Sequence, residues 1–502
     1  MKLLTVLCLV VPLCGFSERI NQEGRILGPA ISVTNSILFN TTNADAVLAS
    51  MQILPVTNPW NEDISQRPRL SNSDAMIAQI MADLSASRRT LQVFQEMNFV
   101  LVPDNQSPVP IEFVDYPDES DPSPYPIHAN LPIEGWPTQV NGETLSQVQQ
   151  DSQGLGGDRH SITVKPGSGF AWETWQTLKV GTNWQASNGA LFNLNTNALR
   201  PDGWTSGDAA GLPMFPALVR YDECERGMVE HACRIVVARS RKAHLYPATH
   251  DASSTAATYV NVPAMGQRVR LKSGFVIPSG WAREEKALLL GLKKYGALVA
   301  DNGGFFSISI TPDDRWPANA FSHISGISIT NFEVVQSTGP TEGPRSPGAP
   351  SVNAGPDQTV LTGSAVTLQG SVQFTGSLPA VQWVQYSGPA AATISDATRT
   401  NSTVTFPVAG VYTLRLGVAD GVHAVAYDAV TFAAGAGRPV VSAVLSGPST
   451  LALSWSGGAP PYVVETAPHL PPASWTAAVT TSVQSVEMPI TNNALFFRVL
   501  SR

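Results

Sequence analysis

The apolar residues of this chain occur in short runs that alternate with polar residues, and glycines and prolines separate the runs. In residues 411–416, Val, Thr and Arg alternate with Tyr and Leu, a period of two that places successive side chains on opposite faces of a β-strand. About nine further runs of this kind precede residue 337, without a regular alternation of strands and helices. The pattern predicts a mainly β protein: a β-sandwich or jelly-roll-like N-terminal domain with a few helices, then two smaller β-sandwiches.

Two segments have the apolar spacing of an amphipathic helix instead. Residues 71–97 begin with a polar cap at Asn72 or Ser73 and then repeat apolar residues at helical intervals. Residues 281–295 place leucines on one face and lysines in the last turn, and Gly296 ends the pattern. We expect one helix in each segment.

The length and one change in composition predict the domain organisation. A chain of 502 residues is too long for a single core and implies about three domains. Residues 337–350 contain no apolar side chain large enough to anchor a core, which predicts a linker. We expect a large β-rich catalytic or ligand-binding domain at 18–336 and smaller domains at 351–435 and 436–502.

Residues 1–17 combine Lys2 with an apolar stretch that is too short to cross a bilayer. They predict a removable signal peptide and a secreted or cell-surface protein, with a lipid anchor at Cys14 as the weaker alternative. No other apolar stretch is long enough to predict a membrane span. The remaining cysteines, Cys224 and Cys233, are spaced for a disulfide in an oxidising compartment.

The charge and the missing motifs exclude several function classes. The formal net charge is −8 and the basic residues are scattered, so nucleic acid is not an expected partner. Phosphate-loop, nucleophile-elbow, zinc-protease and dinucleotide-binding signatures are absent, so no cofactor is expected. The acidic loop 115–121 could bind a structural calcium ion, although a solvated loop is the favoured explanation. His231, His244 and His250 match no metal motif, so no other metal site is predicted.

A row of cations is the sharpest local pattern. Arg268, Arg270 and Lys272 alternate with other residues and therefore share one face of an expected strand. Such a row fits an anionic ligand, for example a uronate or a sulfated glycan. The alternative is a solvent-facing row paired with carboxylates of neighbouring strands.

A histidine and tyrosine group lies just upstream of this row. His244 and Tyr246 share one face of an expected strand, and His250 follows in a turn. If this strand neighbours residues 265–275, these groups would supply the base and the acid for β-elimination of a uronate. An isolated histidine is otherwise more often structural.

Hydrolysis of a glycosidic bond requires two carboxyl groups that face each other. Glu173 lies among tryptophans, Asp222 ends an expected strand at 218–223, and Asp158 and Asp208 lie in polar turns. Each of these carboxylates, taken alone, is also explained as a turn or ion-pair residue.

The long polar loop 195–216 is a candidate wall of a substrate groove. Ordered loops of this length inside a compact domain are usually functional, and Trp204 within it argues for order and for sugar stacking. An ordered surface crossover is the alternative.

Three resemblances add to this reading. The phrases AGPDQTV, WVQYSGP and GVYTLRLGVADG in residues 351–435 resemble the polycystic-kidney-disease (PKD) type of immunoglobulin-like module, which implies a non-catalytic spacer or binding sandwich. Residues 436–502 resemble a fibronectin type III sandwich. Residues near 54–336 resemble a family of secreted bacterial proteins through phrases such as GDRH, NALRPDGWTSGDAAGLP and VADNGG, and this resemblance implies no activity.

We therefore expect a secreted protein that cleaves an extracellular polysaccharide, either anionic or neutral, as a glycoside hydrolase or a polysaccharide lyase. A non-catalytic carbohydrate-binding or adhesion protein is the alternative, and the oligomeric state is left open. The candidate catalytic residues are Glu173, Asp222, His250 and Tyr246. The candidate substrate-binding residues are Trp204, Arg268, Arg270, Lys272 and His244.

Overall fold

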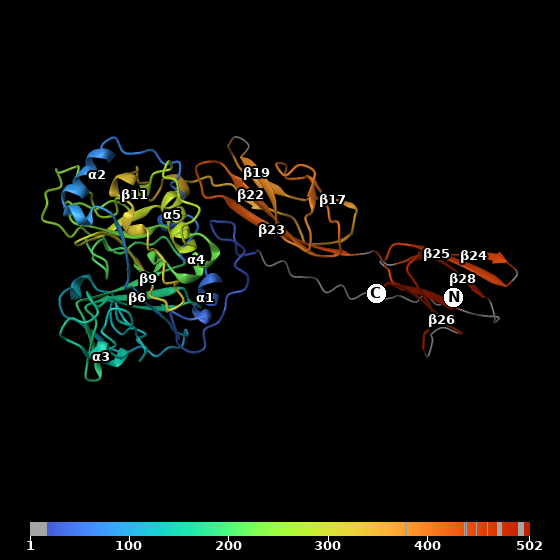
Figure 1. The fold of residues 1–502 in the computed structure, drawn as a ribbon, viewed down its shortest axis with the longest axis horizontal. Coiled ribbons are helices and arrows are strands. Elements are labelled where there is room, and N and C mark those ends of the chain that lie inside the picture. The colour runs from blue at the N-terminus through green and yellow to red at the C-terminus, as the bar shows by residue number, and fades with distance from the viewer. Residues whose placement is uncertain are drawn as a thin grey trace. The chain divides into compact units, whose positions relative to one another are not determined.

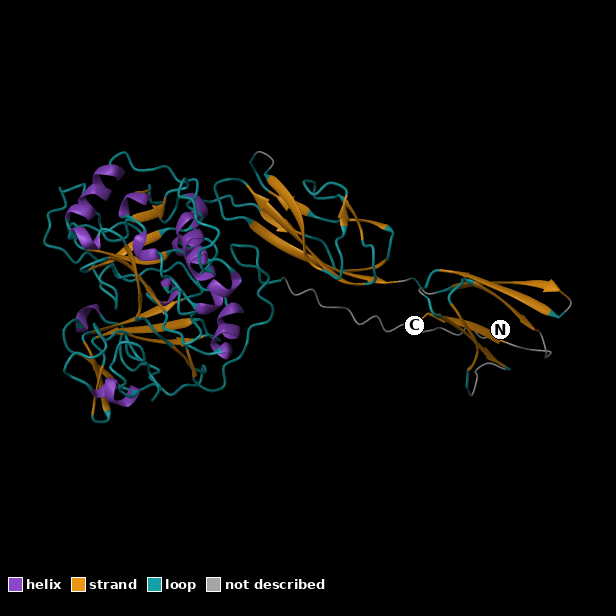
Figure 2. Ribbon diagram, viewed as in Figure 1, coloured by secondary structure: helices purple, strands orange, loops and turns teal. Residues whose placement is uncertain are grey.

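The computed structural model describes residues 18–376, 379–435, 437, 439–447, 449–458, 460–468, 474–489 and 496–501. The predicted signal peptide at 1–17 lies outside them. Strands make up most of the regular structure, so the expected mainly β class is confirmed (Figure 2). Residues 18–349 with 420–425 form one compact unit, and the described residues of 350–419 and 426–502 form another. Among the described residues, no helix is long and apolar enough to cross a membrane.

Three sheets build the large unit, and Figure 1 labels β6 and β9 of one of them and β11 of another. The five-stranded sheet runs in the order β1 (Ile37–Leu38), β3 (Val100–Leu101), β5 (Ser161–Lys165), β6 (Phe170–Trp175), β9 (Asn188–Asn193). The six-stranded sheet runs in the order β14 (Phe332–Val334), β11 (Arg268–Leu271), β12 (Ala297–Asn302), β10 (Cys233–Val237), β13 (Phe306–Ile310), β2 (Leu91–Gln95). A smaller sheet contains β4 (Ile111–Phe113), β8 (Asn183–Ala186) and β7 (Leu178–Val180). Parallel pairs occur in all three sheets, as in β10 with β12 and β13 with β2, so the sheets are mixed rather than purely antiparallel.

The helices only partly follow their predicted positions. The helices are α1 (Thr42–Ala49), α2 (Ser73–Ala82), α3 (Leu145–Gln150), α4 (Tyr221–Arg226) and α5 (Arg283–Lys294). The expected helix at 281–295 is confirmed as α5, whereas the helix expected over 71–97 ends at Ala82 and the chain enters β2 at Leu91.

The strand expected at 218–223 is wrong, because α4 begins at Tyr221. Asp222 and Glu223 occupy its first turn, where carboxylates favour a helix N-terminus. Gly227 ends the helix with a φ of 95°, in the left-handed region that glycine adopts without strain.

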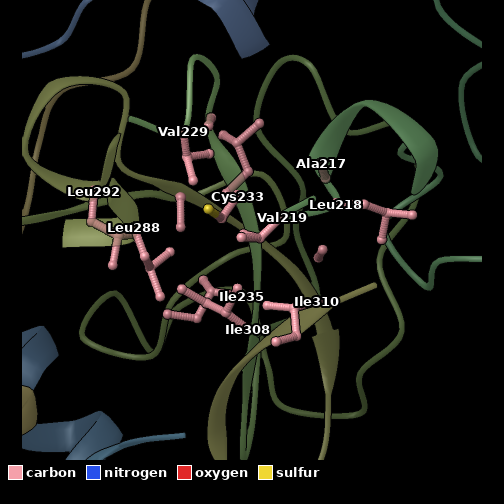
Figure 3. Packing of buried hydrophobic residues seen from close by; sticks show 14 of the residues in the cluster. Ala217, Leu218, Val219, Val229, Cys233, Ile235, Leu288, Leu292, Ile308 and Ile310 are labelled. Carbon is pink, nitrogen blue, oxygen red and sulfur yellow. The ribbon is translucent and has the colours of Figure 1, made fainter. Parts of the chain in front are cut away.

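The six-stranded sheet has one apolar and one polar face. On β10 and β13, Ile235, Ile308 and Ile310 point to the same side and are fully buried. Figure 3 shows them gathered with Leu288 and Leu292 of α5, whose apolar stripe covers this side of the sheet. The alternate residues, which include Arg234 and Ser309, point to the opposite face.

Cys224 on α4 and Cys233 on β10 are both buried free thiols, which corrects the predicted disulfide. The spacing alone did not reveal that Cys224 belongs to a helix and Cys233 to a strand. Burial raises the pKa of both thiols, which makes them unreactive in the folded protein.

We expect iodoacetamide to leave both cysteines unmodified in the native protein and to alkylate both in denaturant without a reductant. The modified peptides can be weighed by mass spectrometry. Alkylation that requires prior reduction would show that the disulfide forms after all.

The second unit contains two separate sandwiches with their own cores. Residues 351–435 form three sheets. The first pairs β15 (Ser351–Asn353) with β18 (Ser371–Gln373), and the second runs in the order β16 (Gln358–Leu361), β23 (Ala426–Gly435), β22 (Gly410–Ala419), β19 (Ala380–Ser387). The third runs in the order β17 (Ala365–Thr367), β21 (Thr403–Thr405), β20 (Thr393–Ile394). Trp383, Tyr412 and Phe432 are buried between them.

The tail domain follows with two three-stranded sheets. They contain β24 (Val440–Gly447), β25 (Thr450–Ser456) and β28 (Ser485–Pro489), and β27 (Thr476–Thr481), β26 (Tyr462–Ala467) and β29 (Phe496–Ser501). Trp455 from the first sheet and Tyr462 from the second share one core, which makes this domain a sandwich as well.

The expected linker 337–350 is in part a component of the large unit. Thr338 donates to Glu62 at 2.6 Å, and the Arg345 guanidinium contacts the same carboxylate at 2.9 Å. The side chains of both Arg345 and Glu62 are only 4% exposed, so the segment is held by a buried ion pair.

Candidate functional site

A cluster of ionisable side chains lies on the polar face of the six-stranded sheet and at its edge. Four carboxyl groups and two cations meet there, and we call them the charged cluster. Its members are Glu96, Glu134, His160, Asp208, Arg234 and Asp301.

Arg234 on β10 is the centre of the charged cluster. Its Nη2 and Nε donate to the two carboxylate oxygens of Asp208 at 2.7 and 3.0 Å, a bidentate pair in which neither side chain reaches solvent appreciably. Nη1 donates to Ser309 Oγ on β13 at 2.8 Å, and Nη2 also lies 3.5 Å from Asp301 at the end of β12. Ser309 in turn donates to Glu96 at 2.7 Å. The guanidinium therefore links three carboxyl groups.

Asp208 reaches this position because its loop is hydrogen-bonded along β12. The Ala210 amide donates to the Ala300 carbonyl at 3.0 Å, which lays the loop on the strand that carries Asp301. The Ser206 hydroxyl accepts from the Asp208 amide at 2.9 Å and closes a local turn.

His160 connects the charged cluster to the five-stranded sheet. Its Nδ1 lies 2.8 Å from the Glu134 carboxylate and its Nε2 lies 2.7 Å from the Gly207 carbonyl. Both partners can only accept, so both ring nitrogens donate and the ring is an imidazolium. Burial alone would lower the pKa of His160, but the Glu134 carboxylate raises it to about 9.

Glu96 and Asp301 are the two carboxyl groups of the charged cluster without a cation of their own. Burial, and then the neighbouring Glu134, raises the pKa of Glu96 to about 7. Burial, and then the neighbouring Asp208, raises the pKa of Asp301 to about 7. Both remain partly accessible, with 23% of the Asp301 side chain exposed. The site therefore presents two carboxyl groups that exchange protons near neutral pH beside a fixed guanidinium.

The imidazolium makes a testable contribution to stability. The folded pKa of His160 is about 9 against 6.5 for the free side chain, so the folded state binds more protons in this interval and loses stability as the pH rises through it. We expect His160→Gln to lower the unfolding free energy by about 3 kcal/mol at pH 6, and by much less at pH 9.5, in urea titrations. A deficit that is equal at both pH values would contradict an imidazolium.

Glu173, a predicted catalytic residue, lies fully buried on β6 of the five-stranded sheet. Its carboxyl group accepts hydrogen bonds from the Met214 and Phe215 amides at 2.8 Å each, at the end of the Asp208 loop. Burial raises its pKa to about 7, and Asp208 is near enough to raise it further. Glu173 therefore holds the end of the Asp208 loop through backbone hydrogen bonds, and its fully buried carboxyl group is not accessible to a substrate.

Asp222 and the remaining predicted catalytic groups lie apart from one another. Asp222 on α4 pairs with Arg226 at 2.7 Å. Tyr246 is half-buried beneath the Arg345 guanidinium. His250 lies at the rim of the charged cluster, where its Nδ1 contacts the Ala209 carbonyl at 2.6 Å.

The expected strand through His244 and Tyr246 does not form beyond one bridge between His244 and Met265. His244 pairs instead with Asp202 at 2.9 Å. Consequently the histidine and tyrosine group does not share one strand face, as the pattern had predicted.

Arg268 and Arg270 lie on one face of β11, but that face is inside the protein, whereas Lys272 follows the strand and is only partly buried. Arg268 is 4% exposed and donates to the backbone carbonyls of Pro59 and Tyr295. Arg270 is 8% exposed and pairs with Glu333 at 2.8 Å, and Lys272 donates to the Thr330 carbonyl at 2.9 Å. The two arginines are therefore not presented to an anionic ligand.

The loop 195–216 lines a small cavity together with Trp60 and Phe192. Arg200 of the loop stacks between Phe192 and Trp204, with its guanidinium 5.8 and 5.5 Å from the two ring centres. The same loop carries Asp208 into the charged cluster. The loop thus lines a cavity, its role in a substrate groove stays a prediction, and Trp204 contacts the guanidinium of Arg200.

The acidic loop 115–121 is tied to this region by internal contacts. The Glu119 carboxylate accepts from the Thr205 amide at 2.9 Å, and Asp121 pairs with Arg200. Within the described ranges, no group of three or more His, Cys, Asp or Glu side chains is placed to hold a metal ion. The calcium site stays an untested prediction.

The comparisons with known proteins concern the smaller unit. Residues 354–433 match a family model described as a PKD domain, so this part of the chain is a PKD domain. The solution structure of the PKD domain from the KIAA 1837 protein is 25% identical and covers 20% of this chain and 91% of its own, with a TM-score of 0.16. That of human KIAA0319 is 19% identical and covers 23% of this chain and 98% of its own, with a TM-score of 0.17. No curated protein matches the chain.

Proposed function

We propose that the large unit is a secreted glycoside hydrolase that cleaves an extracellular polysaccharide with Glu96 and Asp301 as its acid and base. The observation that carries the proposal is the placement of these two partly exposed carboxyl groups on either side of Arg234, where both titrate near neutral pH.

Glycoside hydrolysis uses one protonated carboxyl group, which donates to the leaving oxygen, and one carboxylate, which activates water or attacks the sugar. At pH 7 a pair of this kind holds about one proton between its two members, which is the required charge state. Arg234 favours the ionised form of whichever group releases its proton. The Gly135 amide donates to the Glu96 carbonyl at 2.8 Å, which holds the segment that carries Glu134 beside Glu96.

Hydrolysis is favoured over β-elimination because the arginines of the cationic row are buried. Elimination from a uronate needs exposed cations that neutralise the sugar carboxylate, and Arg268 and Arg270 are buried and bonded internally. The PKD domain supports a polymeric substrate outside the cell, since sandwich appendages of exported proteins commonly attach or space a working domain.

The deciding experiment is incubation of the full chain with neutral and acidic polysaccharides while reducing ends and ultraviolet absorbance are recorded. New reducing ends without an absorbance gain support the proposal. An absorbance gain from unsaturated uronates would show that the protein cleaves by β-elimination and not by hydrolysis. Retention on insoluble polymer with neither signal would show that the protein binds the polymer without cleaving it.

A further inference from the structure

The polar face of the six-stranded sheet continues beyond the charged cluster along β2. β13 pairs in parallel with β2, and Phe306 lies beside Leu91. Phe305 therefore lies at the start of β2, whereas Glu96 follows its last residue. The strand between these two ends spans roughly 16 Å, which is longer than one sugar ring.

Two phenyl rings and a valine occupy this part of the face. Phe94 is two residues before Glu96 and points to the same side of the sheet. Its ring contacts that of Phe305 edge to face, with the centroids 5.2 Å apart. Val236 of β10 pairs with Asp301 and extends the apolar surface toward that carboxyl group. The three apolar side chains are partly exposed, and none belongs to a hydrophobic core of the described residues.

Arg88 lies at the far end of this apolar surface. Its guanidinium carbon is 4.2 Å from the centre of the Phe305 ring, and its Nη1 donates to the Gly304 carbonyl at 3.1 Å. The side chain is exposed, and it forms no ion pair with any described residue. The ring and the carbonyl therefore hold a guanidinium that can still bind an anion.

This end of the sheet carries an excess of positive charge. Asp83 pairs with Arg239 at 2.7 Å, so these two charges cancel. Arg89 donates to the Leu84 carbonyl at 3.2 Å, and like Arg88 it has no carboxylate partner in the described part of the chain. Arginine stays protonated in proteins, so the excess depends on no titration. It is a local feature, because the whole chain has a net charge of −8.

We infer that this surface binds the sugars next to the cleaved bond and that the polysaccharide is acidic. We call the surface the aromatic strip and define it as Phe94, Val236, Phe305 and Arg88. The inference rests on the proposed hydrolysis and adds the substrate class to it. The strip adjoins the proposed acid and base, its apolar part suits a stacked sugar ring, and its cation suits a carboxylate or sulfate.

The position of Arg88 agrees with hydrolysis. The length of β2 separates it from Glu96, so the acidic group that it binds belongs to a sugar away from the reacting bond. β-Elimination would instead need a cation at the sugar that reacts.

Binding of the full chain to immobilised polygalacturonate, dextran sulfate and dextran tests the inference. We expect at least one acidic polymer to bind about tenfold more tightly than dextran, and added salt to weaken that binding. A preference for polygalacturonate or for dextran sulfate would identify the anionic group as a carboxylate or a sulfate. Absence of binding to both acidic polymers, or equal binding to dextran, would overturn the inference.

Three variants locate the polymer on the strip. Arg88→Met removes the charge and Phe94→Ala removes a ring. Gly304→Ala keeps both but displaces the guanidinium, because a Cβ at this position would lie 2.7 Å from Arg88 Nη1. Each variant is expected to weaken binding of the acidic polymer about fivefold or more.

Arg69→Met is the matched control. Arg69 is 45% exposed and pairs with Asp74 in the first turn of α2, at the opposite end of that helix from Asp83, so binding should be unchanged. Unchanged binding of a folded Arg88→Met variant would overturn the inference. A loss with Arg88→Met but not with Phe94→Ala would also overturn it, since charge attraction alone would then explain the binding.

Reducing ends recorded on the same polymers separate this inference from the proposed hydrolysis. Cleavage that Arg88→Met and Phe94→Ala leave unchanged would support hydrolysis and overturn the aromatic strip. Binding that depends on Arg88 and Phe94 without new reducing ends would contradict hydrolysis and support the strip as a binding surface for an acidic glycan.

Discussion

Replacement of Arg234 by methionine is expected to lower the free energy of unfolding by about 3–5 kcal/mol, because it leaves a buried carboxylate without its cation. Asp208 is fully buried and takes both of its ionic hydrogen bonds from this guanidinium. Glu96 and Asp301 would lose the same cation, so the loss should grow as the pH rises and these two groups ionise. Urea unfolding followed by circular dichroism at pH 5.5 and pH 8 measures both effects.

Arg239→Met is the matched control. Its ion pair with Asp83 is also 2.7 Å long, but the arginine side chain is 38% exposed, so a change of about 1 kcal/mol or less is expected. If the two variants were equally stable, the charged cluster would not hold the buried ion pair described above.

Glu96→Gln and Asp301→Asn are each expected to reduce the hydrolytic rate about 10²–10⁴-fold, since each amide can neither donate nor accept the transferred proton. The wild-type rate should peak near neutral pH and fall on both sides, because one group must be protonated and the other ionised. Each variant should lose the limb of the pH profile that belongs to the substituted group.

Glu112→Gln provides the control for a carboxyl group lost outside the charged cluster. Glu112 is exposed on β4 and accepts from Gln185 at 2.7 Å, so its replacement should leave the rate unchanged. Full activity of the Glu96 and Asp301 variants, with thermal stability preserved, would contradict the assignment of these residues as acid and base.

Strand periodicity predicted much of the fold, but it could not assign a polar face to solvent or to the interior. The alternation correctly places Arg268 and Arg270 on one face of β11. That face is buried because residues 59–64 pack against it and offer backbone carbonyls to both arginines. Contacts this distant in sequence are invisible to a local pattern.

The same limit explains the candidate residues. Arg234 alternates with apolar residues in CRIVV, as Ser307 and Ser309 do in FSISI, which is the local signal for a polar sheet face. That these faces adjoin Asp208 depends on a loop hydrogen-bonded to β12, a pairing that no spacing reveals. Glu173 was identified as unusual because of its tryptophan neighbours, and it proves to support the loop that carries Asp208.

The contacts of Thr338 and Arg345 with Glu62 define where an independently expressed fragment of the large unit must end. A fragment that ends at residue 336, where the composition changes, would lack Thr338 and Arg345. The buried carboxylate of Glu62 would then lose both of these partners. Recombinant versions of the large unit should therefore extend through residue 349, and shorter truncations are poor reagents for assigning an activity to this part of the chain.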